Sequence, residues 1–310
     1  MTNSGPKIMV IGSINRDLVV RCHTLPAPGQ TLLAESSTEI CGGKGANQAV
    51  AAARAGGQVR MIGRVGDDAF ADRLVANLEQ AQIESNHVLR TDGCASGLAV
   101  VAVDDSGQNS IMVVPGSNGQ VSVADIENAR LAIESSSVVL LQLEIPLDTV
   151  VAAIGMARSA GVPVIVDPAP APDEWLDQLF HVDLLCPNES EAAAFVGGPV
   201  ETLKQVESAA RAIHEKGAVN VAITLGDRGT LLFDGNQTQL VEPFPVHAVD
   251  STAAGDAFAG AVAVYWAEHS NLVDAVRYGN AAGALSASRE GAQPSIAQRD
   301  EIEKLWRSAK

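Results

Sequence analysis

The chain has 310 residues, with 46% hydrophobic, 19% charged and 4% aromatic side chains and a net charge of −16 at pH 7. This length and apolar content suffice for one large folded domain and exclude a disordered or fibrous chain. The acidic charge and the few aromatic rings exclude a nucleic acid as a partner. The first residues, MTNSGPKIMVIGSIN, resemble no signal peptide, and no apolar run could span a membrane. We therefore expect a cytoplasmic protein without a membrane partner.

Short apolar runs alternate with longer, Ala-rich runs along the chain. Continuous apolar strands separated by helices indicate a mostly parallel sheet covered by helices on both faces, which is a three-layer α/β sandwich. Strands are predicted over 7–12, 58–63, 137–143, 162–167, 182–186 and 219–225. Helices are predicted over 46–56, 68–82, 147–160, 189–196, 203–216, 254–267 and 273–289.

Four short β-type runs interrupt this alternation. The first two surround the turn LPAPG, and the other two surround the hairpin signal DDSGQN. We expect them to form a small separate sheet. Each pair begins near the carboxyl end of a strand, where α/β folds bind ligands, so this sheet is expected to be a lid. The runs cover 17–22, 31–40, 97–103 and 110–115, within inserts at about 14–41 and 96–116 of a single domain spanning 1–310.

The sequence DSTAAGDAFAG at 250–260 places small residues directly before an expected helix. The first N–H groups of a helix have no intrahelical partner, so such a turn can hold an anion. Asp256 lies in the same turn. A carboxylate there either stabilises the helix dipole or acts as a base beside a phosphoryl group, and the adjoining anion turn favours phosphoryl transfer.

A second glycine-rich turn, GGKGANQ, opens the helix predicted at 46–56. It is neither a Walker A loop, because glycine follows Lys44 where Ser or Thr is required, nor a GxGxxG motif. The turn alone is typical of a structural helix entry. Together with Asn15 and Asp17 after the first strand, however, Lys44 and Asn47 provide amide and charged groups that can recognise the hydroxyls of a neutral polyol.

Four further features allow two interpretations each. Glu144 at the end of SVVLLQLE either joins the hydroxyl-binding set or is a solvated carboxylate. Asn188 and Glu191 either hold hydrated Mg²⁺ beside phosphates or cap a helix. The turn TLGDRG at 224–229 either approaches a flat ligand or is a plain β-turn. The loop at 289–295 either binds a monovalent cation or only turns the chain.

The six histidines form no HxH or HExxH pair, and the four cysteines form no CxxC pair. We therefore expect no zinc site, no catalytic thiol and free cysteines.

Several motifs resemble those of the ribokinase-like (PfkB) carbohydrate kinases and follow the same order along the chain as in that family. The likeness extends over essentially the whole sequence. GGKGANQA, LQLEIP and GAQPS are most similar to the ribokinase branch of that family. The resemblance implies an ATP-dependent kinase that phosphorylates the 5-hydroxyl of D-ribose, with Mg²⁺ as cofactor and K⁺ as activator. The lid of the family often pairs with a second lid, so a homodimer is expected. The motifs are GGKGANQAVAAARAG at 42–56, PNESE at 187–191, TLGDRG at 224–229, DSTAAGDAFAG at 250–260 and GAQPS at 291–295.

The resemblance also implies residue roles. Asp256 matches the catalytic base, and Ala253, Ala254 and Gly255 match an anion hole facing the γ-phosphate. The positions that match sugar-binding ones are Asn15, Arg16, Asp17, Gly43, Lys44, Gly45, Ala46, Asn47, Glu144 and Asp256. The positions that match Mg²⁺–phosphate and nucleotide-binding ones are Asn188, Glu191, Thr224, Leu225, Gly226, Asp227, Arg228, Gly229, Gly255 and Asn280. The positions that match K⁺ ligands, several through backbone carbonyls, are Asp250, Thr252, Ser286, Arg289, Gly291 and Ser295.

Two of these positions leave specificity open. Arg16 stands where a small residue is common in the family, and it favours an anionic or larger sugar only if its side chain points inward. Asn280 lies at a variable site near the adenine, which leaves strict ATP preference open. The competing interpretations are a kinase of another sugar or a nucleoside, such as deoxyribose, and a non-catalytic sugar-binding protein. A Rossmann dehydrogenase lacks support because GSIN replaces GxGxxG after the first strand.

Overall fold

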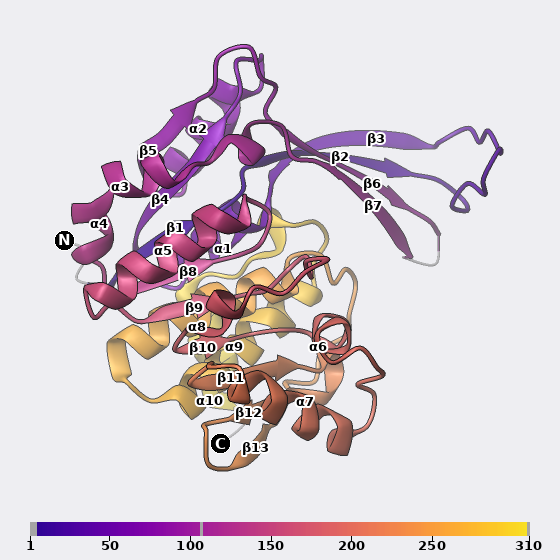
Figure 1. The fold of residues 1–310 in the computed structure, drawn as a ribbon. Coiled ribbons are helices and arrows are strands. Elements are labelled where there is room, and N and C mark those ends of the chain that lie inside the picture. Colours follow the sequence, from indigo (N-terminus) through magenta and orange to yellow (C-terminus); the bar gives the residue numbers. More distant parts are fainter. Residues whose placement is uncertain (1–4, 106–107, 309–310) are drawn as a thin grey trace.

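The computed structural model describes residues 5–105 and 108–308 and contains two β-sheets (Figure 1). The larger sheet is parallel throughout except at one edge, where its last two strands are antiparallel to their neighbours. The predicted fold class, an α/β protein with a mostly parallel sheet and a small separate sheet, is confirmed. The strands of the larger sheet are, in spatial order, β13 (Thr238–Val241), β12 (Thr230–Phe233), β11 (Asn220–Thr224), β10 (Leu184–Leu185), β9 (Val164–Val166), β8 (Val138–Leu141), β1 (Lys7–Ile11), β4 (Gln58–Val65) and β5 (Glu84–Arg90).

Helices cover both faces of this sheet, because its strands are apolar on both sides. In β1, Ile8 and Val10 pack into one hydrophobic core, whereas Met9 and Ile11 pack into the other. No helix within 5–105 and 108–308 has the length and apolar character that a membrane crossing requires. The first core is completed by α1 (Lys44–Arg54), α2 (Ala71–Gln80), α8 (Ala254–His269), α9 (Leu272–Ala287) and α10 (Arg299–Ser308). The second is completed by α3 (Val123–Asn128), α4 (Arg130–Glu134), α5 (Leu147–Ser159), α6 (Glu189–Val196) and α7 (Leu203–Glu215).

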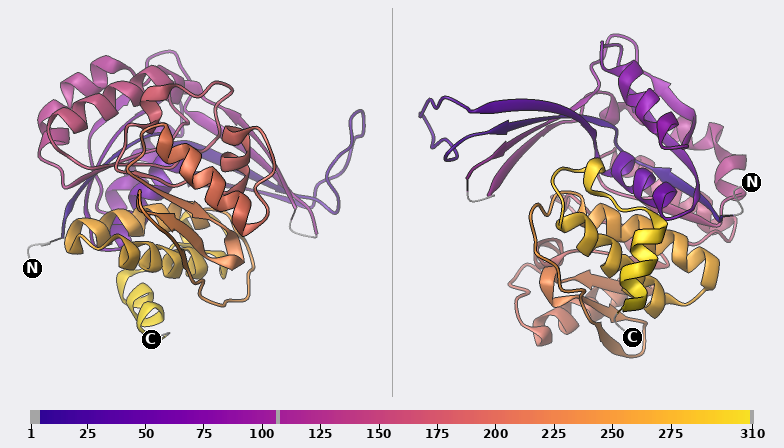
Figure 2. Two further views of the ribbon diagram at one scale, coloured as in Figure 1. Left: turned by 60° about the horizontal axis from the view of Figure 1, so that its bottom comes forward. Right: turned by 180° about the vertical axis from the view of Figure 1, so that it is seen from behind.

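The small sheet extends from the body of the molecule as an arm (Figures 1 and 2). Every residue of its last strand, β7, is exposed. Of the hairpin turn predicted at 104–109, residues 106–107 lie outside the described residues. In spatial order its strands are β3 (Ser36–Gly42), β2 (Asn15–Arg21), β6 (Gly97–Val103) and β7 (Asn109–Val114).

Several predicted boundaries were wrong for identifiable reasons. The strand predicted over 31–40 begins at Ser36, because its partner β2 ends at Arg21, which pairs with Ser36. The helix predicted over 68–82 begins at Ala71, because the Asp68 side chain accepts hydrogen bonds from the N–H groups of Phe70 and Ala71 in a preceding turn. The sequence analysis also missed β5, β13, α3, α4 and α10.

Helices α1 and α8 lie unusually close together. A Cβ on Gly260 of α8 would lie 2.6 Å from the Ala51 Cβ and 2.8 Å from the Gln48 carbonyl oxygen of α1. Only a glycine allows two backbones to approach so closely. The contact brings together the two helices that begin with the glycine-rich turn GGKG and with the turn around Asp256.

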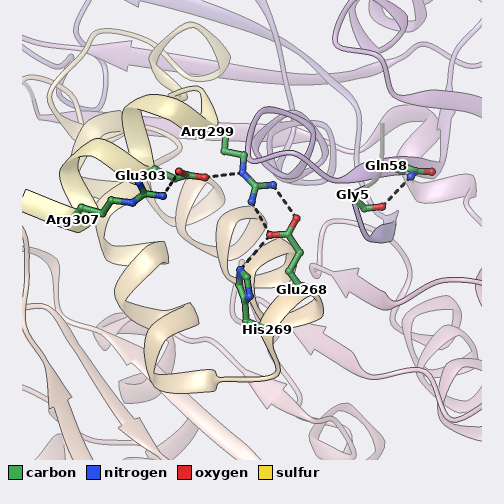
Figure 3. A network of polar contacts seen from close by, with 7 residues as sticks. All are labelled: Gly5, Gln58, Glu268, His269, Arg299, Glu303 and Arg307. Carbon is green, nitrogen blue, oxygen red and sulfur yellow. Dashed lines mark hydrogen bonds and ion pairs between the residues drawn. The ribbon is translucent and has the colours of Figure 1, made fainter. Parts of the chain in front are cut away.

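The C-terminal helix α10 is fastened to the end of α8 by charged groups (Figure 3). Both terminal nitrogens of Arg299 donate to the Glu268 carboxylate at 2.9 Å, and its Nε donates to Glu303 at 2.9 Å. Arg307 donates to the same Glu303 carboxylate at 2.8 Å. Such two-pronged contacts are the stronger class of ion pair, so this network holds the C-terminal end of α8 against α10.

Candidate active site

The segments that follow the central strands meet at the carboxyl edge of the large sheet. The chain turns in opposite directions from the neighbouring strands β1 and β8, and α/β folds bind ligands at such a switch point. Asn15 follows β1, Glu144 follows β8 and Asp167 follows β9. Asn188 follows β10, and Thr224 ends β11. Predicted residues that are far apart in sequence therefore share one edge.

The GGKG turn is built against the segment that follows β1. Gly43 has a φ of 89°, which favours glycine, and a Cβ on Gly45 would lie 2.5 Å from the Ser13 backbone nitrogen. The Gly45 and Ala46 N–H groups donate to the Ser13 Oγ at 3.3 Å and its carbonyl at 2.9 Å. The turn is therefore locked to the same segment that leads into Asn15.

The Asp256 carboxylate is buried and held by amide side chains of α1. The Asn47 Nδ2 donates to one oxygen at 2.9 Å, and the Gln48 Nε2 donates to the other at 3.0 Å. The same Gln48 nitrogen donates to Asp167 at 2.7 Å, and the Gln48 Oε1 accepts from the Gln142 Nε2 at 2.5 Å. This network fixes the orientation of Asp256.

Lys44 lies among several carboxylates at this edge. Burial lowers the pKa of its ammonium group, but the charges of Asp256, Asp167, Glu144 and Glu191 together raise it above the ordinary value. Lys44 therefore stays charged. Burial, despite the opposing charge of Lys44, raises the pKa of Asp167, and neighbouring carboxylates add to that rise.

These groups surround a cavity of about 210 Å³. Asp256 lines it together with Asp167, which follows β9. The predicted residues that also line it are Lys44, Asn188, Glu191, Thr224, Ala253 and Gly255.

The turn before α8 supplies the candidate anion site at this cavity. Ala253 has a φ of 60°, in the left-handed region. The Ala254 N–H donates to the Ser251 carbonyl at 3.1 Å, so the structure does not leave all three predicted groups free. The N–H groups of Ala253, Gly255 and Asp256 have no partner among the described residues, so these three donors remain for an anion.

Asn15 begins the small sheet and is buried. Its Oδ1 accepts from the Asn118 Nδ2 at 2.6 Å, while the Asn118 Oδ1 accepts from the Ile14 N–H at 2.9 Å. Asn118 follows β7, so both inserts meet at this point. The small sheet thus joins the carboxyl edge through hydrogen-bonded amide side chains.

Asp17 and Asn47 each have a buried oxygen, the Oδ1, that lacks a partner among the described residues. Burial, with the charges of Glu144 and Asp256, raises the pKa of Asp17 to about 7. A buried acceptor without a donor costs about 1–3 kcal/mol, so these oxygens call for a ligand with hydroxyl or amine hydrogens.

Arg16 lies on the other face of β2. Its guanidinium carbon is 4.0 Å from the centre of the Phe70 ring, and one nitrogen is 3.7 Å from a Glu39 oxygen. Asn15 and Asp17 are buried on the opposite face, as strand alternation requires. The orientation that the sequence left open is therefore outward, and Arg16 is not part of the site.

Asn188 and Glu191 form a capping box at the start of α6. The Asn188 Oδ1 accepts from the Glu191 N–H at 2.9 Å, and the Glu191 oxygens accept from the Asn188 N–H at 2.7 Å and its Nδ2 at 2.9 Å. The capping interpretation therefore holds, and both residues also line the cavity. Burial raises the pKa of Glu191.

The turn at 224–229 connects β11 to β12. The Leu225 N–H donates to the Gly229 carbonyl at 2.8 Å, and Gly226 and Gly229 have φ values of 60° and 88°. Asp227 and Arg228 are exposed, and Arg228 forms an ion pair with Glu189. The structure thus shows a tight turn whose first residue, Thr224, reaches the cavity.

Asn280 lies apart from the cavity, on α9. Its Oδ1 accepts from the Thr230 hydroxyl at 2.6 Å, and its Nδ2 donates to the carbonyls of Val241 and Glu242 at 3.1 Å each. All three contacts hold α9 against β12 and the end of β13.

The residues expected around K⁺ occupy two adjoining loops. The Asp250 carboxylate joins them, since it accepts from the Thr252 N–H and from the Gly291 N–H at 2.9 Å each. Burial alone would raise the pKa of Asp250, but the hydrogen bonds that it accepts from Thr252 and from the Gly291 N–H outweigh this effect and lower its pKa. The loop before α8 is thereby tied to the loop after α9.

The remaining members of this set lie at the end of α9. The Ser286 and Ser295 hydroxyls are buried and 2.7 Å apart. The Arg289 guanidinium donates to Glu301 at 2.5 Å, so its side chain is paired with the first turn of α10. Its backbone carbonyl is the group that this position could offer to a cation.

The sequence analysis assigned no role to Gln48, Gln142 or Asp167. Gln48 is four residues after Lys44, which places both on one face of α1. Asp167 was the last residue of a predicted strand, at the edge where ligands bind. Helical spacing was thus a signal for Gln48, and strand-end position was a signal for Asp167. Gln142 had no such signal, because its contact with Gln48 depends on how distant segments pack.

The chain belongs to the pfkB family of carbohydrate kinases, because the model of that family matches residues 6–299. It is a sugar phosphotransferase.

Full-length relatives include two kinds of kinase. The ribokinase of Bacillus subtilis is 39% identical over 298 residues, covering 96% of this chain and 98% of the relative. The deoxyribokinase of Salmonella typhi is 38% identical over 299 residues, covering 95% and 97%.

Solved structures of ribokinases have the same fold as this chain. The ribokinase of Thermotoga maritima superimposes with a TM-score of 0.87 at 37% identity, covering 97% of this chain and 99% of that one. The ribokinase of Arabidopsis thaliana, solved with ribose and ATP, gives a TM-score of 0.87 at 33% identity over the same shares.

Proposed function

We propose that the protein transfers the γ-phosphate of ATP to the 5-hydroxyl of D-ribose, producing D-ribose 5-phosphate and ADP. The observation that carries this proposal is the pair of buried acceptor oxygens on Asp17 and Asn47 that lack donors among the described residues. The Asn47 side chain also donates to Asp256, so hydroxyls held by these acceptors would lie beside a carboxylate base. The ribokinase relatives support a pentose as the hydroxyl donor.

Asp256 serves as the general base. It accepts the proton of the 5-hydroxyl while the sugar oxygen bonds to the γ-phosphorus, and the bond from that phosphorus to the β-phosphate oxygen breaks, so ADP leaves with the electron pair. The free N–H groups of Ala253, Gly255 and Asp256, with charged Lys44, stabilise the negative charge on the transferring group. A single turn of chain thus provides both the base and the anion donors.

Asn188 and Glu191 would hold hydrated Mg²⁺. Their side-chain oxygens accept hydrogen bonds from N–H groups in the capping box, yet each carboxylate oxygen has a second lone pair for a metal-bound water. The charge balance also fits, because one lysine faces Asp167, Glu191 and Asp256 at the cavity and ATP would add further negative charge. When bound, Mg²⁺ would neutralise part of the negative charge of the phosphates.

Asp250, Thr252, Ser286, Gly291 and Ser295, with the carbonyl of Arg289, would hold K⁺. The donor set consists of oxygens, which suits an alkali cation, and Asp250 already joins the two loops. A bound cation would act on the adjoining turn before α8, which contains the anion donors.

The nucleotide would extend from the cavity past Thr224 along the turn at 224–229 toward Asn280. The glycines of the turn let a flat ring approach its backbone. In this arrangement Asn280 orders β12 and β13 beneath the base, since its side-chain amide contacts both.

The small sheet would serve as the lid and the surface for a homodimer. Ile111 and Met112 on β7 are 52% and 65% exposed, and Val113 and Val114 are also exposed. A monomer rarely leaves a continuous apolar strand uncovered, and a second copy would cover it. Light scattering after size exclusion should give twice the chain mass, and Met112→Lys should give the mass of one chain.

2-Deoxy-D-ribose is the second candidate acceptor, supported by the deoxyribokinase relatives. The two sugars differ at one hydroxyl. A site built to hydrogen-bond that hydroxyl would reject the analogue strongly, whereas a site that leaves it unbound would accept both.

A coupled ADP-release assay across pentoses and hexoses, with and without K⁺, tests the proposal. We expect D-ribose to give the highest kcat/KM and K⁺ to raise the rate. Equal or greater kcat/KM with 2-deoxy-D-ribose would transfer the assignment to that sugar. Sugar binding without sugar-dependent ADP release would contradict catalysis and indicate a non-catalytic sugar-binding protein.

A further inference from the structure

We propose that His23, Glu35 and Asp105 form a binding site for a divalent transition-metal ion, with Zn²⁺ as the expected occupant, at the distal end of the small sheet. The three ligand atoms lie within 4.8 Å of one another. They come from three segments: His23 follows β2, Glu35 precedes β3 and Asp105 follows β6. This site is separate from the carboxyl edge and independent of the proposed sugar kinase activity.

The interatomic distances match the edges of a metal coordination shell. The His23 Nδ1 is 2.9 Å from the Asp105 Oδ2 and 3.2 Å from the Glu35 Oε1. Zinc lies about 2.0–2.2 Å from imidazole and carboxylate ligands, so ligands at octahedral or tetrahedral angles are about 2.8–3.6 Å apart. Both measured distances therefore suit ligands of one ion.

A proton satisfies this arrangement less well than a metal. A protonated imidazole has one hydrogen on its Nδ1, and that hydrogen can point at only one of the two carboxylates. The Nδ1 of a neutral imidazole carries either one hydrogen, with the same limit, or a lone pair that repels both carboxylates. A divalent ion would accept electron pairs from all three groups, and its charge would balance the two carboxylates.

The choice of metal follows from the ligand types. An imidazole with two carboxylates suits first-row transition metals, whereas Mg²⁺ and Ca²⁺ prefer oxygen ligands alone. The side chains of His23, Glu35 and Asp105 are 75%, 45% and 63% exposed, so an ion can enter without unfolding and complete its shell with water.

The backbone beside these ligands is already ordered. The Glu35 N–H donates to the Arg21 carbonyl at 2.8 Å, and the Cys22 N–H donates to the Val103 carbonyl at 3.0 Å. These bonds continue the pairing of β2 with β3 and with β6. A bound ion would therefore connect three neighbouring strands at the end of the arm that is farthest from the body (Figure 1).

The test is zinc titration of tag-free, metal-stripped protein against a chromophoric chelator. We expect one zinc per wild-type chain, and a loss of affinity of about tenfold or more in His23→Gln, since loss of even a residue that only supports a metal ligand costs about 10–100-fold. Asp105→Asn and Glu35→Gln should give comparable losses. His247→Gln removes a different exposed histidine and should bind zinc as the wild type does.

A second measurement locates the ion. Zinc should slow amide hydrogen exchange in residues 22–35 of the wild type and leave it unchanged in His23→Gln, while circular dichroism in chelator shows that both chains are folded. Absence of zinc binding by folded wild type, or equal affinity in His23→Gln and wild type, would overturn the proposal.

Discussion

The carboxyl edge of the large sheet and the distal end of the small sheet both gather carboxylates from separate segments, but in opposite surroundings. Asp256 and Asp17 are 5% and 8% exposed, whereas His23 is 75% exposed. At the buried edge the charges are compensated by Lys44, by amide donors and by a raised pKa of Asp17. At the exposed end, water can screen the carboxylates. Burial therefore makes one cluster rigid and chemically tuned, and leaves the other accessible.

Removal of the base should produce the largest effect. Asp256→Asn keeps the size of the side chain but cannot accept the hydroxyl proton, so we expect kcat to fall by about 10²–10⁴-fold. Calorimetry should still detect sugar binding, because Asp17 and Asn47 remain. A kcat near that of the wild type would contradict the assigned role.

The next effect tests whether the buried edge depends on close backbone contact. In Gly45→Ala the new Cβ would lie 2.5 Å from the Ser13 nitrogen, so the turn must shift. A displacement of about 1 Å near the reacting groups can cost about 10²-fold, and we expect kcat/KM to fall to that extent. Gly198→Ala is the matched control, since nothing lies within 4 Å of its Cβ. Equal activity of the two variants would contradict this account.

An intermediate effect is expected from pH. The pKa of Asp17 rises from 3.8 to about 7 on folding, chiefly through burial. Between pH 3.8 and about pH 7, Asp17 therefore keeps a proton in the folded chain that it has lost in the unfolded chain. The stability that Asp17 contributes is present at low pH and is lost as the pH rises through its folded pKa of about 7. Between pH 5 and pH 8, the free energy of unfolding should fall more in the wild type than in Asp17→Asn. Urea denaturation of both proteins at the two pH values measures the difference, and parallel changes would refute it.

The smallest effect is expected on the outer face of the small sheet. Arg16→Ala removes the contact with Phe70, which is worth about 0.5–1 kcal/mol at an exposed site. Since the side chain points away from Asn15 and Asp17, kcat/KM for the sugar should fall by no more than about fivefold, the factor that corresponds to the whole contact energy. A large loss of sugar affinity would show that Arg16 turns inward during binding.

The sequence predicted the layers because short apolar runs alternate with longer Ala-rich runs. The resemblance to the PfkB kinases, together with the motifs, assigned Asp256, Lys44 and Asn188 to one site. The sequence could not predict contacts that depend on three-dimensional approach. The bond from Gln142 to Gln48 and the outward turn of Arg16 are set by packing. The histidine spacing likewise gave no sign of the group around His23, whose partners are supplied by two other segments.

Gly260 has a consequence far from its own position. Because Gly260 has no side chain, α8 packs directly on Ala51 and Gln48 of α1. This contact sets the distance between the GGKG turn, which would bind the sugar, and the turn around Asp256, which would deprotonate it. A methyl group at this crossing would push α1 and α8 apart, and would thereby separate the sugar-binding turn from Asp256 without contacting either. The distance over which the proton would be transferred is thus fixed by a helix crossing in the core.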